Sequence, residues 1–320
     1  MVEELQLQAT VPPEMAGQRL DRVLAQLFSD FSRARLQHWI RAGQVSVDGI
    51  QPRPRDRVTG GEKIALHAVL EVEGDWQPEA IPLDIIHEDE SLLVINKPAG
   101  LVVHPAAGNR DGTLLNALLH HAPELAAVPR AGIVHRLDKD TSGLLVIARN
   151  LTVHKRLIEM MQARDIQREY QAVIQGVMTA GNTVDAPIGR HPLQRKRMAV
   201  VRSGRLAVTH YRVIERFRAH THIRVQLETG RTHQIRVHMA HLHYPLLGDP
   251  VYGGRLRIPA GCSQALDEQL HRFKRQALHA QRLQLSHPLT GEDMDWQAAL
   301  PDDMRVLLDV LRQDANESSE

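Results

Sequence analysis

The chain has almost no cysteine, few aromatic residues and no long apolar run. Its single cysteine, Cys262, rules out an internal disulfide and a zinc site built on cysteine pairs. No apolar segment approaches the roughly 18 residues that a membrane-spanning helix needs. The opening residues MVEELQLQ are too acidic and polar for a signal or transit peptide. We therefore expect a cytoplasmic protein with no membrane partner.

Signatures of metal and nucleotide binding are also missing. The sequence contains neither a GxGxxG loop nor a Walker loop. Histidines gather at positions 233, 238, 241 and 243, but they lack the HExxH spacing and no carboxylate lies among them. We expect no metal site.

Basic residues are concentrated in two segments, although the net charge is only +1. Residues 17–58 contain eight arginines against four aspartates, and residues 189–236 contain eleven arginines and one lysine against two glutamates. Guanidinium groups pair with phosphates through two parallel hydrogen bonds, so these segments favour a nucleic-acid partner. Ordinary solvated faces are the alternative reading.

Apolar residues at helical spacing predict two short helices, in GQRLDRVLAQLF and FSRARLQHWI. GQVSVDGI and GGEKIAL, which follow, are expected to be short strands. RLD, SR and GxVxVDG in these segments resemble the S4 RNA-binding fold, and a small α/β appendage of another purpose is the alternative. Four arginines of this region are expected to bind RNA: Arg19, Arg33, Arg35 and Arg41.

The larger remaining part alternates apolar and polar residues along its strands, as in THIRVQL. Such alternation favours antiparallel strands with one solvated face. The predicted fold class is therefore α+β, with the small S4-type α/β domain and a domain built on a mixed, largely antiparallel sheet with flanking helices. The expected divisions are an N-terminal segment (1–16), the S4 domain (17–66), a linker (67–80), the larger domain (81–312) and a disordered acidic tail (313–320).

The segment HRLDKDTSG precedes LLVIA, which is expected to be a buried strand. A carboxylate in this loop would be ionised beside Arg136 and Lys139, which suits a nucleophile better than a general acid. Asp138 and Asp140 are both candidates. Aspartate and serine often cap turns, so the loop alone favours a structural role over a catalytic one.

Two further residues stand out. Tyr170, on a predicted strand in IQREYQAV, is suited either to stacking on a base or to a place in the core. Arg236 lies beside an apolar stripe that includes Met239, in a short helix that Thr232 is placed to cap. A charge in that position needs an anionic partner.

Together, these segments resemble the RluA-type pseudouridine synthases. NKPAGLVVHP, HRLDKDTSGLLVIA, REY, GRTHQIRVH and GDPVYG occur in this order, and the match runs from about Gly17 to about Ala299. Arg168 stands where the family has either lysine or arginine. The resemblance implies an enzyme that isomerises uridine in RNA to pseudouridine, with no metal and no cofactor.

The resemblance also implies roles for single residues. Asp138 would be the catalytic carboxylate, acting as a nucleophile on the ribose, as a nucleophile on the uracil, or as a base in an elimination. Arg236 would pair with Asp138, and Tyr170 would stack on the flipped base, while Asp140 would serve the turn. Substrate contacts are expected from Arg136, which would help to extrude the uridine, and from Ile235 and His135.

Within the family, the resemblance points to the helix 69 stem-loop of 23S rRNA, so the expected partner is 23S rRNA or a precursor of the large ribosomal subunit. Related enzymes with the same motifs modify other rRNA or tRNA sites. A catalytically silent RNA-binding or assembly factor would not need Asp138, Tyr170 and Arg236 together. A hydrolytic glycosidase would need a second carboxylate. The sequence shows no heptads, and we expect a monomer.

Overall fold

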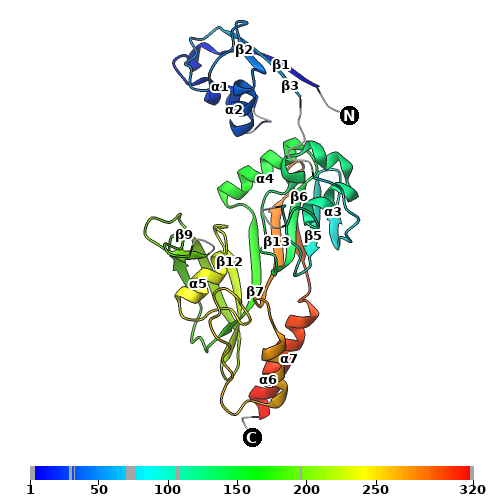
Figure 1. The fold of residues 1–320 in the computed structure, drawn as a ribbon, viewed down its shortest axis with the longest axis vertical. Coiled ribbons are helices and arrows are strands. Elements are labelled where there is room, and N and C mark those ends of the chain that lie inside the picture. The colour runs from blue at the N-terminus through cyan, green and yellow to red at the C-terminus, as the bar shows by residue number, and fades with distance from the viewer. Residues whose placement is uncertain are drawn as a thin grey trace.

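The computed structural model describes residues 4–28, 31, 33–69, 76–105, 109–194 and 197–317. A small domain lies at one end, and a larger domain built on one long sheet forms the rest (Figure 1). Within the described ranges, every helix is too short or too polar to cross a bilayer.

The small domain packs its two helices on one antiparallel sheet of order β1-β3-β2. Its elements are β1 (Glu4–Thr10), the 3-10 turn η1 (Pro13–Met15), α1 (Leu20–Leu27), α2 (Arg33–Arg41), β2 (Val45–Val47) and β3 (Lys63–Val69). The residues whose spacing predicts the two helices are buried in its core, among them Leu20, Leu24, Leu36 and Ile40. Both predicted helices are therefore confirmed.

β1 begins this domain earlier than the sequence suggested. We expected residues 1–16 to precede the domain, but β1 pairs with β3 over its whole length. Alternate residues of β1, Leu5, Leu7 and Ala9, pack against the domain's core. This period of two is the strand signal in ELQLQAT.

Asp21 is fully buried in this domain and organises the side chains around it. Arg19 and Arg33 each donate through Nε and Nη2 to its carboxylate, at 2.7 to 3.1 Å, and Gln37 Nε2 donates at 2.5 Å. Burial alone would raise the pKa of the Asp21 carboxyl, but the hydrogen bonds outweigh burial and lower it to about 2. Two of the four arginines expected to bind RNA thus also hold an internal carboxylate.

The larger domain is built on nine strands in the order β4-β5-β6-β13-β7-β12-β11-β8, with β14 paired to β13. In chain order its elements are β4 (Ile85–Glu88), β5 (Leu92–Lys97), α3 (Leu114–His121), η2 (Pro123–Ala127), η3 (Pro129–Gly132), β6 (Ser142–Ala148), α4 (Leu151–Ala163), β7 (Gln167–Gln175), β8 (Asn182–Asp185), β9 (Ile188–Arg190), β10 (Met198–Val200), β11 (Val208–Arg216), β12 (His220–Leu227), α5 (Gln234–His241), α6 (Gln264–Arg272), β13 (Leu278–Ser286), β14 (Asp293–Gln297) and α7 (Asp302–Glu317).

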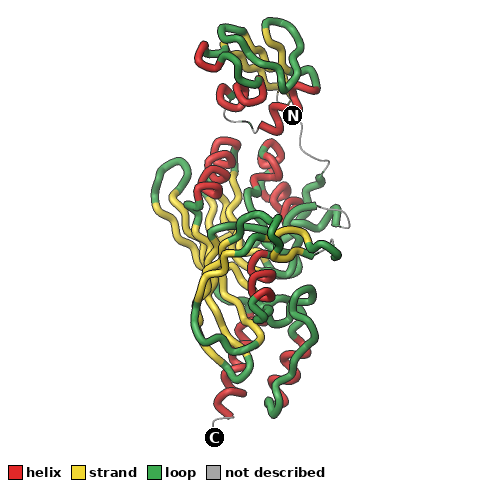
Figure 2. The backbone as a smooth tube through the Cα atoms, turned by 90° about the vertical axis from the view of Figure 1, so that its left-hand side faces the viewer, coloured by secondary structure: helices red, strands yellow, loops and turns green. Residues whose placement is uncertain are grey.

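The β6–β13 pair of this sheet is parallel, and the other described pairs are antiparallel. Figure 2 shows the strands as one layer along the long axis of the molecule. β9 and β10 form a separate two-stranded ribbon. The expected α+β class, with a mixed and largely antiparallel sheet, is confirmed.

Helices cover both faces of the sheet at β5 and β6. Leu93 and Leu145 pack with α3 in one core cluster, whereas Leu92 and Val146 pack with α4 in another. A strand buried on both faces carries a continuous apolar run. This is why LLVI and LLVIA do not alternate as THIRVQL does.

The expected linker 67–80 is shorter in the structure. β3 continues to Val69, and residues 70–75 lie outside the described residues. Trp76 already packs against the core of the larger domain, and the Gln77 carbonyl accepts a hydrogen bond from Asn116 Nδ2 at 2.8 Å. Residues 76–80 therefore belong to the larger domain.

The expected disordered tail, residues 313–320, is helical as far as Glu317, and the last three residues lie outside the described residues. Asp314 anchors this end of α7 because its carboxylate is buried and accepts hydrogen bonds from Ser263 N at 2.6 Å and Arg218 Nη1 at 3.3 Å. The acidic composition that suggested disorder includes a carboxylate with internal partners.

The Asp21 network leads to a stability prediction. The pKa of Asp21 is lower in the folded chain than the usual 3.8, so its contribution is present above pH 4 and is lost as the pH falls towards 2. Asp21→Asn should therefore lower the stability of the small domain by about 2 kcal/mol at pH 7. Denaturant unfolding followed by Trp39 fluorescence would measure this, with the exposed Glu14→Gln as the control. Equal stability of the two variants would contradict the prediction.

Candidate active site

A cavity of about 880 Å³ opens on the larger domain, where the loop before β6, the strand β7 and the start of α5 meet. Its volume is within the range of small-molecule and nucleotide sites. The lining includes every residue expected at the catalytic site: His135, Arg136, Asp138, Tyr170, Ile235 and Arg236.

The loop that carries Asp138 is tied to the sheet by its backbone and its hydroxyls. The carbonyl of Asp138 accepts from Thr141 N at 3.0 Å, which closes a turn. Thr141 Oγ1 accepts from Gln276 Nε2 at 3.0 Å, and Ser142 Oγ lies 2.9 Å from His279 Nδ1. The two hydroxyls of HRLDKDTSG therefore fasten the loop to the segment around the start of β13.

Gly143 completes this attachment. A Cβ at this position would lie 2.2 Å from the carbonyl oxygen of Ala280, and the φ angle of +118° also favours glycine. Only glycine allows β6 and β13 to approach as parallel neighbours here, directly after the Asp138 loop.

Asp140 serves the turn through its backbone. Its carbonyl accepts from Arg275 Nη1 at 3.1 Å, while its carboxylate forms no hydrogen bond within the described residues. We expected Asp140 to cap or support the turn; the structure assigns the contact to the main chain and leaves the side chain without that task.

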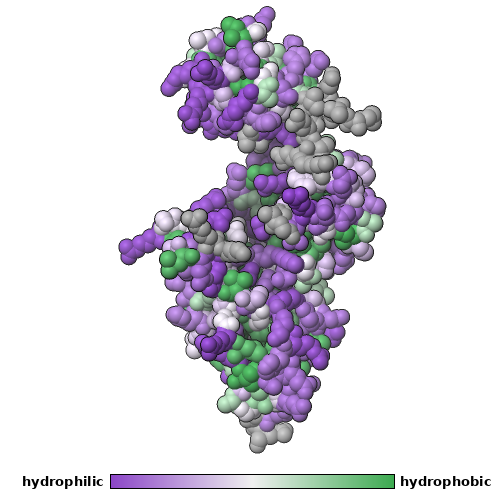
Figure 3. All heavy atoms as spheres, in the orientation of Figure 1, coloured by the Kyte–Doolittle hydropathy of each residue, from purple (hydrophilic) through white to green (hydrophobic). Residues whose placement is uncertain are grey.

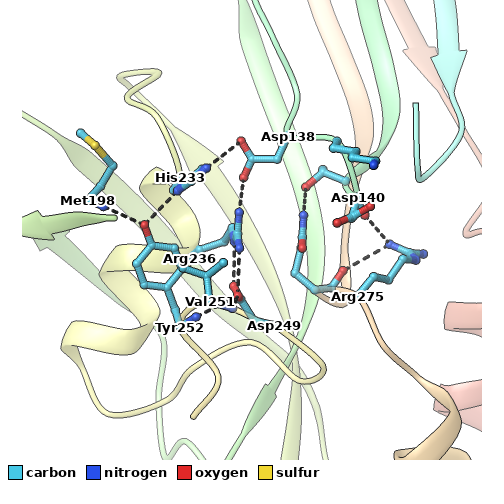
Figure 4. Close-up of polar contacts among 12 residues, drawn as sticks. Asp138, Asp140, Met198, His233, Arg236, Asp249, Val251, Tyr252 and Arg275 are labelled. Atoms are coloured by element: carbon cyan, nitrogen blue, oxygen red, sulfur yellow. Dashed lines mark hydrogen bonds and ion pairs between the residues drawn. The ribbon is translucent and has the colours of Figure 1, made fainter. Parts of the chain in front are cut away.

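Arg236 lies between two carboxylates (Figure 4). Its Nη1 donates to Asp138 Oδ2 at 2.9 Å, while Nε and Nη2 donate to the two oxygens of Asp249 at 2.7 and 2.9 Å. Asp249 Oδ1 also accepts from the backbone N–H groups of Val251 and Tyr252. Burial opposes the charge on Arg236, but both carboxylates raise its pKa above the ordinary arginine value. Arg236 is thus a fixed cation that orients Asp138.

His233 and Tyr252 flank this group. His233 Nε2 lies 3.8 Å from Asp138 Oδ1, and its Nδ1 lies 2.8 Å from the Tyr252 hydroxyl, which also accepts from Met198 N at 2.9 Å. α5 begins directly after His233, which has a left-handed φ of 57°. The cap therefore differs from the Thr232 cap that the sequence suggested.

The remaining expected residues occupy different depths of the cavity. Tyr170 is 5% exposed, and burial raises the pKa of its hydroxyl. Arg136 is exposed and forms no hydrogen bond or ion pair within the described residues. His135 Nε2 accepts from Val146 N at 3.1 Å, and burial lowers the pKa of its imidazole to about 3. His135 is therefore neutral and fastens the loop to β6, while Ile235 is a buried part of the wall.

The cavity is strongly cationic. Among its described lining residues Asp138 is the single acid. The lining cations are Arg130, Arg136, Lys139, Arg168, Arg231 and Arg236. Beneath the loop, the buried Lys97 ammonium donates to the carbonyls of Pro98, Leu101 and Lys139. Burial lowers the pKa of Lys97 to about 7, against the opposing effect of Asp140 and Asp138.

Four residues of the site were not assigned a role from the sequence: Lys97, His233, Asp249 and Tyr252. Each lies in a recognised motif, Lys97 in NKPAG, His233 in GRTHQIRVH and the other two in GDPVYG. One sequence signal could have pointed to Asp249 and Tyr252. Their motif, GDPVYG, follows shortly after the helix that carries Arg236, an arginine that needs an anionic partner. Within the described residues, no cluster of three or more potential metal ligands occurs.

Comparison with known proteins identifies the class of enzyme. Residues 91–241 match the model of the RNA pseudouridylate synthase family, and residues 18–64 match that of the S4 domain. A solved structure, human RNA pseudouridylate synthase domain containing 4, superposes with a TM-score of 0.56 at 29% identity, covering 71% of this chain and 92% of that one.

Relatives with the same arrangement extend the match over nearly the whole chain. Ribosomal large subunit pseudouridine synthase D of Pseudomonas aeruginosa is 60% identical over 314 residues, covering 98% of both chains. The protein of that name from Escherichia coli (strain K12) is 56% identical over 318 residues, covering 99% of this chain and 98% of its own. The chain belongs to the RluA-type pseudouridine synthases with an N-terminal S4 domain, enzymes that isomerise uridine in RNA.

The pair of Arg236 and Asp249 leads to a second prediction. Asp249→Asn removes a carboxylate from a fully buried guanidinium, and breaking such a pair costs about 3 kcal/mol of folding stability. Asp295→Asn breaks a pair of the same chemistry with Arg282 that is exposed to solvent, and should cost much less stability than Asp249→Asn. Thermal or denaturant unfolding of both variants measures the difference. Equal losses of folding stability in the two variants would contradict the prediction that the buried pair of Asp249 and Arg236 contributes more than the exposed one.

Proposed function

We propose that this enzyme converts uridines to pseudouridine in large-subunit rRNA, in the helix 69 stem-loop of 23S rRNA, with Asp138 as the catalytic carboxylate. The observation that carries the assignment of the catalyst is the contact of Asp138 with the buried Arg236 at the wall of a cationic cavity. The names of the most similar relatives, which specify the large ribosomal subunit, support the substrate.

Asp138 is suited to act as an ionised carboxylate. Arg236 holds its Oδ2, and an arginine so placed stabilises the negative form without giving up a proton. Attack on the ribose, attack on the uracil ring and removal of a proton all require that ionised form. A second carboxylate for hydrolysis is not found among the described lining residues, so the site supports isomerisation rather than glycoside hydrolysis.

Arg136 and Tyr170 are suited to moving and holding the base. Extruding a nucleotide from its stack costs a few kcal/mol, and least for a loop nucleotide. The exposed Arg136, which has no hydrogen bond or ion pair with the described residues, can enter the gap that the uridine leaves. The buried ring of Tyr170 then offers a stacking surface, and its raised pKa keeps the hydroxyl protonated at neutral pH.

The S4 domain supplies affinity for the phosphate backbone. Arg41 is exposed and donates to Gln37 Oε1 at 3.3 Å, and the Arg35 guanidinium lies 6.0 Å from the centre of the Trp39 ring. Arg19 and Arg33 keep 36% and 44% of their side chains exposed while holding Asp21, so they can contact RNA with their orientation already fixed. Figure 3 shows hydrophilic residues over most of this domain's visible face.

The two aspartates of the loop give the test of the catalyst. Asp138→Asn removes the ionised carboxylate and should abolish pseudouridine formation in a helix 69 stem-loop, with RNA binding retained. Asp140→Asn should leave most of the activity, because only the backbone of Asp140 holds the turn. Pseudouridine mapping after incubation of each variant with the RNA measures both. Substantial activity in Asp138→Asn, or comparable losses in both, would overturn the assignment.

Salt dependence tests the role of the S4 domain. Each phosphate contact contributes about −0.7 to −0.9 to the slope of log K against log salt. Replacing Arg35 and Arg41 together by glutamine should weaken binding of the stem-loop and flatten that slope by between one and two. Arg282→Gln, on β13 of the larger domain, is the control. An unchanged slope in the double variant would remove these two arginines from the RNA interface.

A further inference from the structure

Arg168 is a buried cation with no counter-charge among the residues that the structure describes. It lies on β7, two residues before Tyr170, and is only 8% exposed. Its Nε is buried without a hydrogen-bond partner, and within the described residues its guanidinium forms no ion pair. The adjacent acid, Glu169, lies on the opposite face of the strand and pairs with Arg224 at 3.3 Å.

The contrast with Arg236 shows that this is unusual even within the cavity. Arg236 is 4% exposed and has Asp138 and Asp249 as partners. A buried charge without a partner destabilises a fold. Because Arg168 lines the cavity, its counter-charge can come from an anionic group of the molecule that binds there.

The surroundings of Arg168 keep a space for its guanidinium. A Cβ on Gly230, in the loop before α5, would lie 2.9 Å from Arg168 Nη1, so glycine leaves room for this group. The positive charge of Arg168 affects the pKa of two other residues that line the cavity, Tyr170 and His135. Burial raises the pKa of Tyr170 while Arg168 opposes that change, and burial lowers the pKa of His135 with Arg168 adding to the effect.

The depth of Arg168 indicates which part of a nucleotide it meets. Other cations of the lining, Arg130, Arg136 and Lys139, are exposed and suit phosphates, because the RNA backbone must enter and leave through the mouth. Arg168 instead shares the buried face of β7 with Tyr170, the proposed stacking residue. A base seated on that ring would present its edge to Arg168.

We propose that Arg168 is a catalytic residue that stabilises the negative charge developing on the uracil ring, an inference that rests on the proposed function. When C1′–N1 breaks, its electron pair passes to N1 and is delocalised onto O2 and O4. C5 then bonds to C1′, the C5 proton leaves to a base, and N1 gains a proton. Addition of Asp138 to the ring would place charge on O4 instead. Arg168 keeps its own protons throughout and only donates hydrogen bonds.

The first test combines rate and stability. Arg168→Met should slow single-turnover pseudouridine formation by on the order of 100-fold, the usual effect of losing one donor to a developing oxyanion. RNA affinity should be unchanged, and the thermal midpoint should be equal or higher, because an unpaired buried charge has been removed. Arg168→Lys should retain more activity than Arg168→Met. Arg282→Met, on the neighbouring strand β13, is the control and should match the wild type.

The second test distinguishes the base from a phosphate. With 5-fluorouridine at the target position, C5 carries fluorine and has no proton to lose, so the step measured is the breaking of the C1′–N1 bond. The fluorinated ring carries negative charge more easily, so the loss of rate in this step caused by Arg168→Met should shrink. A methylphosphonate beside the target should slow the wild type and Arg168→Met by the same factor. If the methylphosphonate slows only the wild type, Arg168 binds that phosphate and the proposal is wrong.

Other results would also overturn it: a lower thermal midpoint for Arg168→Met, a rate loss fully explained by weaker RNA binding, or equal activity of the lysine and methionine variants. The wild type and Asp138→Asn, assayed on the same RNA, separate the two levels of inference. If the wild type forms pseudouridine and Asp138→Asn does not, the proposed function stands whatever Arg168 does.

Discussion

The proposed catalytic centre depends on one buried guanidinium with a carboxylate on each side. Arg236 comes from α5, Asp249 from the turn that follows it, and Asp138 from a loop 98 residues earlier in the chain. Each group alone would be costly to bury, and the guanidinium between the two carboxylates compensates part of their charge, leaving one net negative charge. The hydrogen bonds are directional, so the group also fixes where the Asp138 carboxylate lies. The stability of this group and the orientation of the proposed catalyst, Asp138, therefore have the same source.

The charged residues around the cavity differ in how far they are enclosed by the protein. Asp249 serves Arg236 and two backbone N–H groups, and is fully enclosed. Asp138 keeps 15% of its side chain exposed, so one carboxylate is left for the substrate. Arg168 represents the opposite arrangement, a buried cation without an ion-pair partner among the described residues. An unpaired buried charge destabilises the fold, so an anionic group bound in the cavity would relieve that cost.

Much of this architecture could be predicted from the order of residues alone. The helices of the small domain follow from apolar spacing, and the doubly buried strands β5 and β6 from their continuous apolar runs. The need of Arg236 for an anion also follows from its place beside an apolar stripe. The proposal of Asp138 as the catalyst came from the resemblance of its motif, since the loop alone favours a structural role.

Other features depend on contacts that no local pattern encodes. Ser142 meets His279 across 137 residues, and β1 finds its partner only in β3, near the other end of the small domain. The role of Asp249 emerges only when the turn after α5 folds back on the helix. The end of α7 looked like a solvated tail because the partners of Asp314 are Ser263 and Arg218, distant in sequence.

The position of β13 in the sheet also sets when activity can arise. β13, formed by Leu278–Ser286, lies between β6, which follows Asp138, and β7, which carries Tyr170. During synthesis, both of those strands leave the ribosome more than a hundred residues before the strand that must separate them. Long-range pairing of this kind is slow to form. The nascent chain therefore lacks a complete site around Asp138 and Tyr170 until its translation is nearly finished.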